Sequence, residues 1–410
     1  MTDFQKNLME RFVRYAKTYS ESSEKNADAG VIPSTPQEWD LAKMLEAEMK
    51  ALGLENVHIT ENCYVYGCLK ASAGLENVAP FALLAHLDTV EEVSGKDVKP
   101  QIIENYDGRP LELGSSGRVL DPEIFPDLKA SVGKTLIVTD GTTVLGADDK
   151  AGIAEILCAC ERIINRQLPH GRISVCFTPD EEIGHGAELL DLERFGADFA
   201  FTVDGDAVNI LNYETFNAAE AVVEISGVNV HPGDAKGKMK NAALIASEFN
   251  SLLPADEIPA MTEGYEGFYH LLSLNANVER AQMKYIIRDH DAGIFEERKK
   301  KMLEIEKALN RRFGEGCIKV TIRDQYRNMA DILNKRPEII ELAHSAILKA
   351  GLEPVCVPVR GGTDGAELSF RGLPCPNLGT GGNAFHGPYE HITAEDMDKA
   401  VEVLVNLLSK

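Results

Sequence analysis

Hydrophobic and polar positions along the chain alternate between the spacing of helices and that of buried strands. The first fifty residues contain two amphipathic segments, and the second begins near Thr35-Pro36 and ends at a glycine. Further on, short apolar runs flank a long apolar helical segment. They predict strands at 81–85, 135–138, 173–177 and 199–203 and a helix at 151–165. Strands that alternate with helices indicate a largely parallel sheet covered on both faces.

A second pattern occupies residues 218–324, where the order is strand, helix, strand, helix, strand. The first pattern then resumes with a helix at 338–350 and an amphipathic helix from Ala394 onward. We therefore predict an α/β fold, with a mostly parallel mixed sheet flanked by helices and an inserted, smaller α+β lid domain at 218–324. The main domain is then discontinuous, at 1–217 and 325–410.

Composition and charge narrow the class of protein. The chain has 65 acidic and 42 basic residues, a net charge of −23, which disfavours nucleic acid and membrane surfaces as partners. No segment has the uninterrupted apolar length of a transmembrane helix, and the N-terminus lacks the features of a signal peptide. The eight cysteines form no CxxC pair, which favours reduced thiols. These features predict a cytoplasmic protein.

Acidic residues and histidines follow three of the predicted strands at the point where each strand ends. His86 follows 81–85, Asp180-Glu181-Glu182 follow 173–177, and Asp204 follows 199–203. Ligand sites of open parallel sheets lie beyond the carboxyl ends of the strands, so these side chains can converge. Asp148, after a glycine-rich turn, and His386, in a glycine-rich loop, can join them.

Mixed histidine and carboxylate donors without thiolates suit zinc, cobalt or manganese. Two cations about 3.5–4 Å apart need a bridging carboxylate and two terminal ligands each, and five residues supply that minimum. Taken singly, each of these groups is more typical of a solvated turn, a helix cap or a hydrogen-bonded loop histidine. Their joint occurrence in one α/β unit indicates a metal site.

Seven segments together resemble the co-catalytic dinuclear zinc exopeptidase family of carboxypeptidases, acylases and aminopeptidases. They are HLDT, GADDKAG, TPDEEIG, TVDG, NVHPGDAKG, RGGTDGAELS and GGNAFHG. Four more segments, IPSTP, VKPQIIENYDG, MTEGYEGFYH and KYIIRDHD, resemble the branch of that family that cleaves tripeptides. The resemblance spans nearly the whole chain and implies a metal-dependent aminopeptidase that acts on short peptides with a free N-terminus, most of all tripeptides.

The resemblance also implies roles for individual residues. His86 and Asp204 would bind one zinc ion, Glu182 and His386 the other, and Asp148 would bridge them. The Asp148-Asp149 peptide bond would be cis. Two residues would have catalytic roles, Glu181 as the general base and Asp88 as the acceptor of the ring N–H of His86.

Three further residues would bind substrate. His231 of the lid would donate to the developing oxyanion, and Arg288 and Arg360 would hold the C-terminal carboxylate of the peptide. Motif context favours Arg360, because Arg288 lies between Asp289 and Asp291 and could instead form a surface salt bridge.

Two departures from the branch concern the surroundings of the site. Residues 90–93 read Val-Glu-Glu-Val, where a small, proline-containing segment is expected, and Asp206 stands where the branch tends to have glycine. Strict selection of tripeptides is therefore less firmly implied than peptidase chemistry. The alternatives are a carboxypeptidase or N-acyl-amino-acid deacylase on the same scaffold, and an inactive peptide-binding homologue. Relatives often pair through the lid, which leaves a homodimer open.

Overall fold

The computed structural model describes residues 1–409 and divides into two compact units. The first unit contains residues 1–213, 331–357 and 363–410, and the second contains 214–330 and 358–362. The boundaries expected from the sequence lay at 217/218 and 324/325. The short segment 358–362, which was expected in the main domain, is part of the second unit and carries Arg360 with it.

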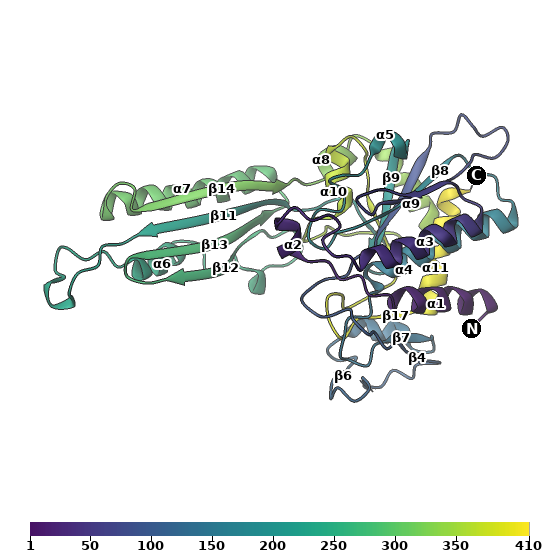
Figure 1. The fold of residues 1–410 in the computed structure, drawn as a ribbon, viewed down its shortest axis with the longest axis horizontal. Helices are drawn as coiled ribbons and strands as arrows, with labels where there is room; N and C mark the ends of the chain where they lie inside the picture. The colour runs from purple at the N-terminus through teal and green to yellow at the C-terminus, as the bar shows by residue number, and fades with distance from the viewer. Residues whose placement is uncertain (410) are drawn as a thin grey trace. The chain divides into compact units, whose positions relative to one another are not determined.

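An eight-stranded mixed sheet forms the centre of the first unit (Figure 1). The strands β8, β3, β9 and β16 are parallel to one another, while β1, β2 and β10 add antiparallel pairs. In spatial order the strands are β1 (Glu55–Ile59), β2 (Val65–Leu69), β8 (Ile173–Thr178), β3 (Phe81–His86), β9 (Phe199–Gly205), β16 (Asn377–Gly379), β10 (Ile210–Asn212) and β15 (Val355–Cys356). The prediction of a mixed sheet with a parallel centre is confirmed.

Both faces of this sheet are buried, which explains the continuous apolar runs in its strands. In β3, Phe81, Leu83 and Ala85 point into a core on one face, while Ala82 and Leu84 point into a core on the other. The first core is shared with the long helices, and the second with the short ones. The helices are α1 (Asp3–Ala16), α3 (Glu38–Leu52), α4 (Ala147–Arg166), α9 (Pro337–Lys349) and α11 (Ala394–Leu408) on the first face, and α5 (Leu192–Phe195) and α10 (Asp364–Phe370) on the second.

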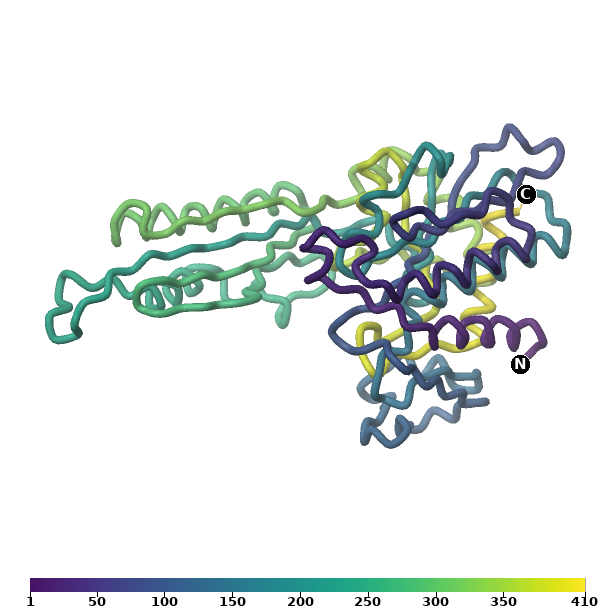
Figure 2. Tube along the Cα trace, in the orientation of Figure 1, coloured from purple at the N-terminus to yellow at the C-terminus, as the bar shows by residue number. Residues whose placement is uncertain are grey.

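Segments far apart in the sequence pack together in this unit. The N-terminal helix α1 lies against α4 and against the C-terminal helix α11, as the purple and yellow segments of Figure 2 show. Three short elements add to the expected pattern: α2 (Glu24–Asp28), α8 (Ala330–Leu333) and the 3₁₀ helix η1 (Pro126–Ser131).

A smaller layer of the first unit has its own apolar core around Tyr106, Leu113 and Leu136. Its three-stranded antiparallel sheet has the order β17-β7-β4. Between β4 and β7 in the sequence, β5 and β6 form a separate two-stranded sheet. The strands are β17 (His391–Thr393), β7 (Leu136–Val138), β4 (Gln101–Ile103), β5 (Leu111–Glu112) and β6 (Val119–Leu120). Because β17 pairs with β7, the chain after His386 is anchored to this layer.

The second unit is an antiparallel sheet with two helices on one face. The sheet order is β12-β13-β11-β14, and alternate residues such as Ala221 and Val223 in β11 face the helices. The elements are β11 (Asn217–Ser226), α6 (Ala242–Ser251), β12 (Phe268–Ala276), β13 (Arg280–Asp289), α7 (Ala292–Phe313) and β14 (Ile318–Tyr326), with the 3₁₀ turns η2 (Pro232–Asp234) and η3 (Pro259–Met261). Strand β12 was missed from the sequence, so the expected three-stranded arrangement was wrong.

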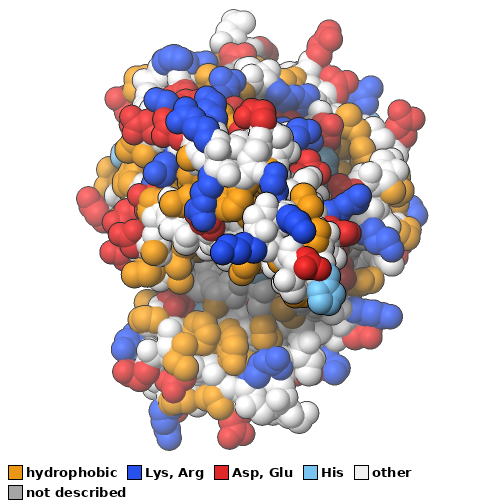
Figure 3. Space-filling model, turned by 90° about the vertical axis from the view of Figure 1, so that its left-hand side faces the viewer, with side chains coloured by type: hydrophobic (Ala, Val, Ile, Leu, Met, Phe, Trp, Pro, Cys, Tyr) orange, Lys and Arg blue, Asp and Glu red, His pale blue; other side chains and the backbone are white. Residues whose placement is uncertain are grey.

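Two surface features bear on the expected partners. Among the described residues, no helix combines the length and the apolar character needed to cross a bilayer. Acidic and basic side chains are interspersed on the face drawn in Figure 3, as expected for a chain with many residues of either charge.

Candidate metal centre

The five expected metal ligands come from five different segments of the first unit. His86 is the last residue of β3, and Asp204 lies near the end of β9. Asp148 lies at the start of α4, Glu182 in the turn after β8, and His386 in the loop between β16 and β17. Four of these ligands lie at or after the carboxyl ends of the parallel strands β3, β8, β9 and β16, which is why they converge.

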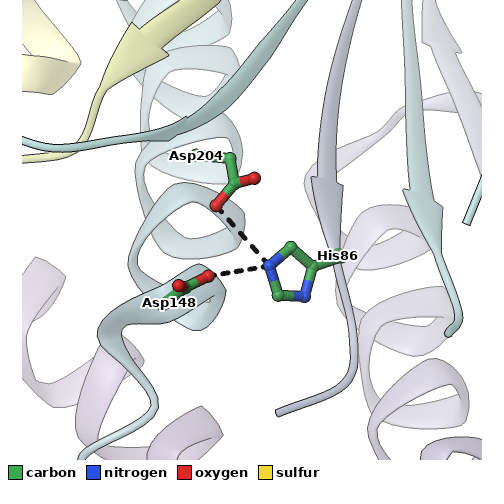
Figure 4. Close-up of side chains that lie close together, drawn as sticks. All are labelled: His86, Asp148 and Asp204. Carbon is green, nitrogen blue, oxygen red and sulfur yellow. Dashed lines mark hydrogen bonds and ion pairs between the residues drawn. The ribbon is translucent and has the colours of Figure 1, made fainter. Parts of the chain in front are cut away.

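The first group of donors contains His86, Asp148 and Asp204, whose side chains point toward one another in Figure 4. The Nε2 atom of His86 lies 2.8 Å from Oδ1 of Asp148 and 3.5 Å from Oδ1 of Asp204. His86 is 2% exposed, so its ring is held inside the unit rather than presented to solvent. One ligand atom from each residue lies within 4.8 Å of the others, which suits a single cation.

The second group contains Asp148, Glu182 and His386. The Nε2 atom of His386 lies 3.2 Å from Oδ2 of Asp148 and 3.1 Å from Oε2 of Glu182. Asp148 therefore offers one carboxylate oxygen to each group, the arrangement that a bridging ligand requires. The Asp148-Asp149 peptide bond is cis, as the family resemblance implied.

Asp88 holds parts of both groups in place. Its carboxylate accepts hydrogen bonds from the backbone N–H groups of Glu181 (3.0 Å) and Glu182 (3.1 Å), and it lies 3.3 Å from Nδ1 of His86. The backbone carbonyl of Asp88 lies 3.1 Å from the same Nδ1. With a proton on Nδ1, Nε2 of His86 is left as the electron-pair donor toward the cation.

The charge of the site favours bound cations. Burial, reinforced by the charge of neighbouring carboxylates, raises the pKa of Glu181 to about 8 and that of Asp204 to about 7. The same two causes raise the pKa of Glu182. Several buried carboxylates in one place disfavour their own ionisation, and cations between them would reverse that effect. The donor set therefore fits two divalent ions.

Three carboxylates around the site had no assigned role in the sequence analysis. Asp149 accepts from the backbone N–H of His86 (3.1 Å) and is fully buried. The backbone N–H of Asp364, the first residue of α10, donates to Oε1 of Glu181 (3.3 Å). Glu390 accepts from the backbone N–H groups of Leu145, Gly146 and Asp148. Asp149 and Asp364 lie in segments that carry the family resemblance and Glu390 follows such a segment, so proximity to these segments was the available signal.

The expected substrate-binding residues lie in the second unit. Arg288 is in β13, where Nη1 donates to the carbonyls of Ala219 (3.3 Å) and Ile287 (3.0 Å). The Nη atoms of Arg360 donate to the carbonyls of Gly264 and Glu266 and to the Thr262 hydroxyl, each at 2.8 Å.

His231 precedes η2 and is exposed. Its Nδ1 accepts from the backbone N–H of Gly233 at 3.2 Å. In the neutral ring this leaves the proton on Nε2, facing away from that bond.

The parallel-centred sheet and two adjoining groups of donors that could each hold a cation fit a dinuclear metallohydrolase of the exopeptidase type. Residues 145–410 match the model of peptidase family M20/M25/M40, and the chain belongs to this family. It is 51% identical over 404 residues to peptidase T of Clostridium perfringens strain 13, with 98% of each chain covered. The expected resemblance to a tripeptide-cleaving branch is therefore confirmed as a resemblance to peptidase T.

Solved structures agree on the fold. The structure of aminopeptidase PepT from Bacillus cereus aligns with a TM-score of 0.76 at 24% identity, covering 98% of both chains. A tripeptidase from Staphylococcus aureus aligns with a TM-score of 0.78 at 22% identity, covering 98% of this chain and 97% of that one. The protein is thus a metal-dependent peptidase. The alternatives, a carboxypeptidase or N-acyl-amino-acid deacylase on the same scaffold and an inactive peptide-binding homologue, are not favoured.

Proposed function

We propose that the protein removes the N-terminal residue from short peptides, with tripeptides as its main substrates. The observation that carries the proposal is the Asp148 carboxylate, which contacts both His86 and His386 while Glu181 lies in the same cluster. The similarity to peptidase T, and to structures described as an aminopeptidase and a tripeptidase, supports this substrate class.

Two zinc ions fit the donors best, because imidazole and carboxylate ligands without thiolates suit zinc in catalytic sites. His86 and Asp204 would hold one ion, Glu182 and His386 the other, and Asp148 would bridge both. When bound, the pair supplies Lewis acidity that lowers the pKa of water and polarises a carbonyl. Removal of metal with a chelator should abolish activity, and re-addition of zinc, cobalt or manganese in turn identifies the effective ion.

Glu181 is the residue that moves protons in this proposal. One of its oxygens accepts from the Asp364 backbone N–H, and the side chain lies within the charge field of His86 and Asp204. It takes a proton from the attacking water and later returns it to the leaving amine, so a single carboxylate serves as base and then as acid.

The test of this role is Glu181→Gln, which keeps the size and removes the proton acceptor. We expect kcat to fall by roughly three or more orders of magnitude, the upper part of the range for general acid–base catalysis, while two metal ions per chain are retained. Glu188→Gln, on the same loop and paired with His185, is the matched control and should leave kcat unchanged. Undiminished turnover of Glu181→Gln refutes the assignment.

A free N-terminus and a short length are the substrate features to be measured. The panel compares a tripeptide with the corresponding dipeptide, tetrapeptide and N-acetylated tripeptide. We expect the tripeptide to have the highest kcat/KM and the N-acetylated form to be inert. If the acetylated peptide is cleaved equally well, the assignment as an aminopeptidase is wrong and the protein is an acyl-peptide hydrolase.

Arg288 has the surroundings of a carboxylate-binding group. Burial lowers the pKa of its guanidinium, since no acidic side chain among the described residues forms an ion pair with it. Its neighbours in the sequence have other partners: Asp289 pairs with Arg298 (2.7 Å), and Asp291 caps α7. The guanidinium also lies over the ring of Tyr326, 5.3 Å from its centroid. We therefore assign the peptide's C-terminal carboxylate to Arg288.

Arg360 and His231 differ in the role in substrate binding that their contacts support. The Nη donors of Arg360 already hold the loop around Gly264, and its guanidinium lies over Phe216 and Phe268. That arrangement favours loop support over direct carboxylate binding, the reverse of the order expected from motifs. The exposed ring of His231, with a proton on Nε2, is suited to donate to an oxyanion.

Replacing Arg288 distinguishes these roles. In Arg288→Lys the fork geometry is lost, and KM for a tripeptide should rise about tenfold or more while KM for the tripeptide amide changes little. Arg280→Lys, at the other end of β13, is the control. An equal effect on acid and amide would remove Arg288 from carboxylate binding.

Location and oligomeric state are further proposals. Seven cysteines are buried as free thiols, which supports a reducing compartment such as the cytoplasm. A dimer through the second unit is supported by its edge strand β12, where Leu272 and Leu274 are exposed. Light scattering of the wild-type protein and of Leu272→Glu measures that interface: a wild-type monomer excludes it.

A further inference from the structure

Glu390 is a buried carboxylate that no step of the proposed reaction uses. It is 1% exposed, and it accepts three backbone hydrogen bonds from one turn. Its Oε2 accepts from Leu145 (2.6 Å) and Gly146 (2.8 Å), and its Oε1 accepts from Asp148 (3.0 Å). The turn requires a left-handed residue, since Gly146 has φ of 76°. The carboxylate therefore holds the backbone that presents Asp148.

The backbone around Glu390 is itself fixed. His391 exchanges two backbone hydrogen bonds with Asn383, at 3.0 and 2.9 Å, which closes the segment 383–391 into a loop. His391 begins β17, which pairs with β7, and its Nε2 lies 2.5 Å from Asp127. Glu390 thus stands at the base of the loop that carries His386.

One side chain consequently joins two ligand-bearing segments. Its backbone belongs to the loop of His386, and its carboxylate binds the turn of Asp148. Those two residues, with Glu182, form the second group of metal donors. In the first group of donors, Glu390 holds only Asp148. The other two donors, His86 and Asp204, lie on strands of the large sheet.

We propose that Glu390 is a positioning residue that sets the separation between Asp148 and His386 and thereby completes the second metal site. The inference rests on the proposed assignment of Asp148, Glu182 and His386 as ligands, and it does not depend on which peptide is cleaved. Loss of the Glu390 carboxylate should weaken the second site more than the first.

The three donors explain why a carboxylate is needed here. In Glu390→Gln one oxygen can still accept from Leu145 and Gly146, but the amide NH2 then faces the N–H of Asp148, and two donors oppose each other. The opposite orientation of the amide would lose two hydrogen bonds instead of one. Glutamine therefore keeps the side-chain volume and two of the three hydrogen bonds to the turn. The hydrogen bond that it loses is the one to Asp148, the residue that would bridge the cations.

Glu395→Gln is the matched control. Glu395 is in α11 of the same unit, and its carboxylate accepts from the backbone N–H of Thr135 (2.8 Å) and from the Thr135 hydroxyl (3.3 Å). It contacts no metal donor, so the variant measures the general cost of this exchange.

The experiment measures bound zinc per chain at a series of buffered free zinc concentrations, for the wild-type protein and both variants. We expect Glu390→Gln to bind its second zinc roughly 10–100-fold more weakly, the effect typical of lost outer partners of metal ligands. The first zinc and the Glu395→Gln control should keep wild-type affinity. Activity of Glu390→Gln on a tripeptide should return as free zinc is raised over the same range.

Two results would overturn the inference. One is that Glu390→Gln binds two zinc ions at wild-type affinity. The other is that the two sites are weakened by the same factor, in this variant and in the control alike. If Glu390→Gln does not fold, as judged by circular dichroism, Glu390→Asp replaces it, because the charge is kept and the carboxylate is retracted by one methylene. A wild-type protein that binds two zinc ions but cleaves no tripeptide would refute the proposed function and leave this inference standing.

Discussion

The substitution Asp88→Asn isolates one hydrogen bond that the structure places beneath the metal centre. Asp88 is fully buried, and its two oxygens have different partners. Oδ1 accepts from the Glu181 backbone N–H and lies 3.3 Å from Nδ1 of His86, while Oδ2 accepts from the Glu182 N–H. Asparagine has nearly the same volume, but it offers only one oxygen, so one side of this arrangement must fail.

The magnitude follows from which side is lost. If the amide oxygen takes the place of Oδ1, Glu181 and His86 keep their acceptor, and the amide NH2 opposes only the N–H of Glu182. The reverse orientation would sacrifice two partners, so the first is favoured. A lost hydrogen bond to a charged acceptor costs about 1.5–3 kcal/mol, which corresponds to roughly 10–100-fold in an equilibrium constant at 1.4 kcal/mol per tenfold. The loss should fall on the site that contains Glu182.

Zinc titration and steady-state kinetics give the assay. Asp88→Asn should bind one of its two zinc ions 10–100-fold more weakly and lose a similar factor in kcat/KM at limiting zinc. Asp291→Asn is the control, because asparagine caps a helix as well as aspartate does and Asp291 only caps α7. Wild-type zinc affinity together with wild-type kcat/KM in Asp88→Asn would show that the carboxylate does not position Glu182.

Two other substitutions test the packing that supports the site. Gly152→Ala should destabilise the protein by about 1–3 kcal/mol or more in urea unfolding, because the new Cβ would clash with the carbonyl oxygen of Val203 and force α4 away from β9. Gly361→Ala, whose Cβ would lie 3.8 Å from Val359 in an ordinary van der Waals contact, is the control, and equal stability of the two variants contradicts this reasoning. Glu48→Gln should lower the free energy of unfolding at pH 7, and the difference from wild type should shrink as the pH falls below the ordinary glutamate pKa of about 4.3. Burial alone would raise the pKa of Glu48, but its hydrogen bond with Tyr15 and the charge of Arg11 outweigh burial and lower it. The stabilisation is therefore present above the ordinary glutamate pKa and is lost as pH falls through the depressed value; a difference between wild type and variant that does not change with pH in this acidic range would contradict the shift.

The elements that could be predicted from the sequence are those whose hydrophobic positions follow a single pattern and whose ends are marked by polar residues. Strand β3 is a continuous apolar run because both of its faces are buried, and the polar residues that follow it mark its end. Strand β12 lacked such a signature, because its outer residues Leu272 and Leu274 are exposed at an edge of the sheet. The apolar pattern therefore does not distinguish it from a loop, and the hairpin with β13 was predicted as one strand.

The metal ligands could be predicted because they are defined by residue type and by position at strand ends. The contacts that surround them could not, because a hydrogen bond between a carboxylate and a distant backbone N–H leaves no periodic trace. Glu390 binds a turn 242 residues earlier in the chain, and its partner is identified only by the fold. Arg288 shows the same limit: the acidic neighbours that argued against it are paired with other groups.

The carboxylates of this centre form two layers with different tasks. The inner carboxylates, those of Asp148, Glu182 and Asp204, are themselves among the donors that would hold cations. The outer carboxylates, those of Asp88, Asp149 and Glu390, accept hydrogen bonds from the backbone of the segments that carry the donors. The outer carboxylates have hydrogen-bond partners without a cation, because backbone N–H groups donate to them. In the inner layer, burial and the charge of Asp148 disfavour ionisation of Glu182 and Asp204 until a cation is bound. The outer layer can therefore hold the ligand positions before metal arrives, which lowers the conformational cost of binding and makes affinity depend on residues that never touch the ions.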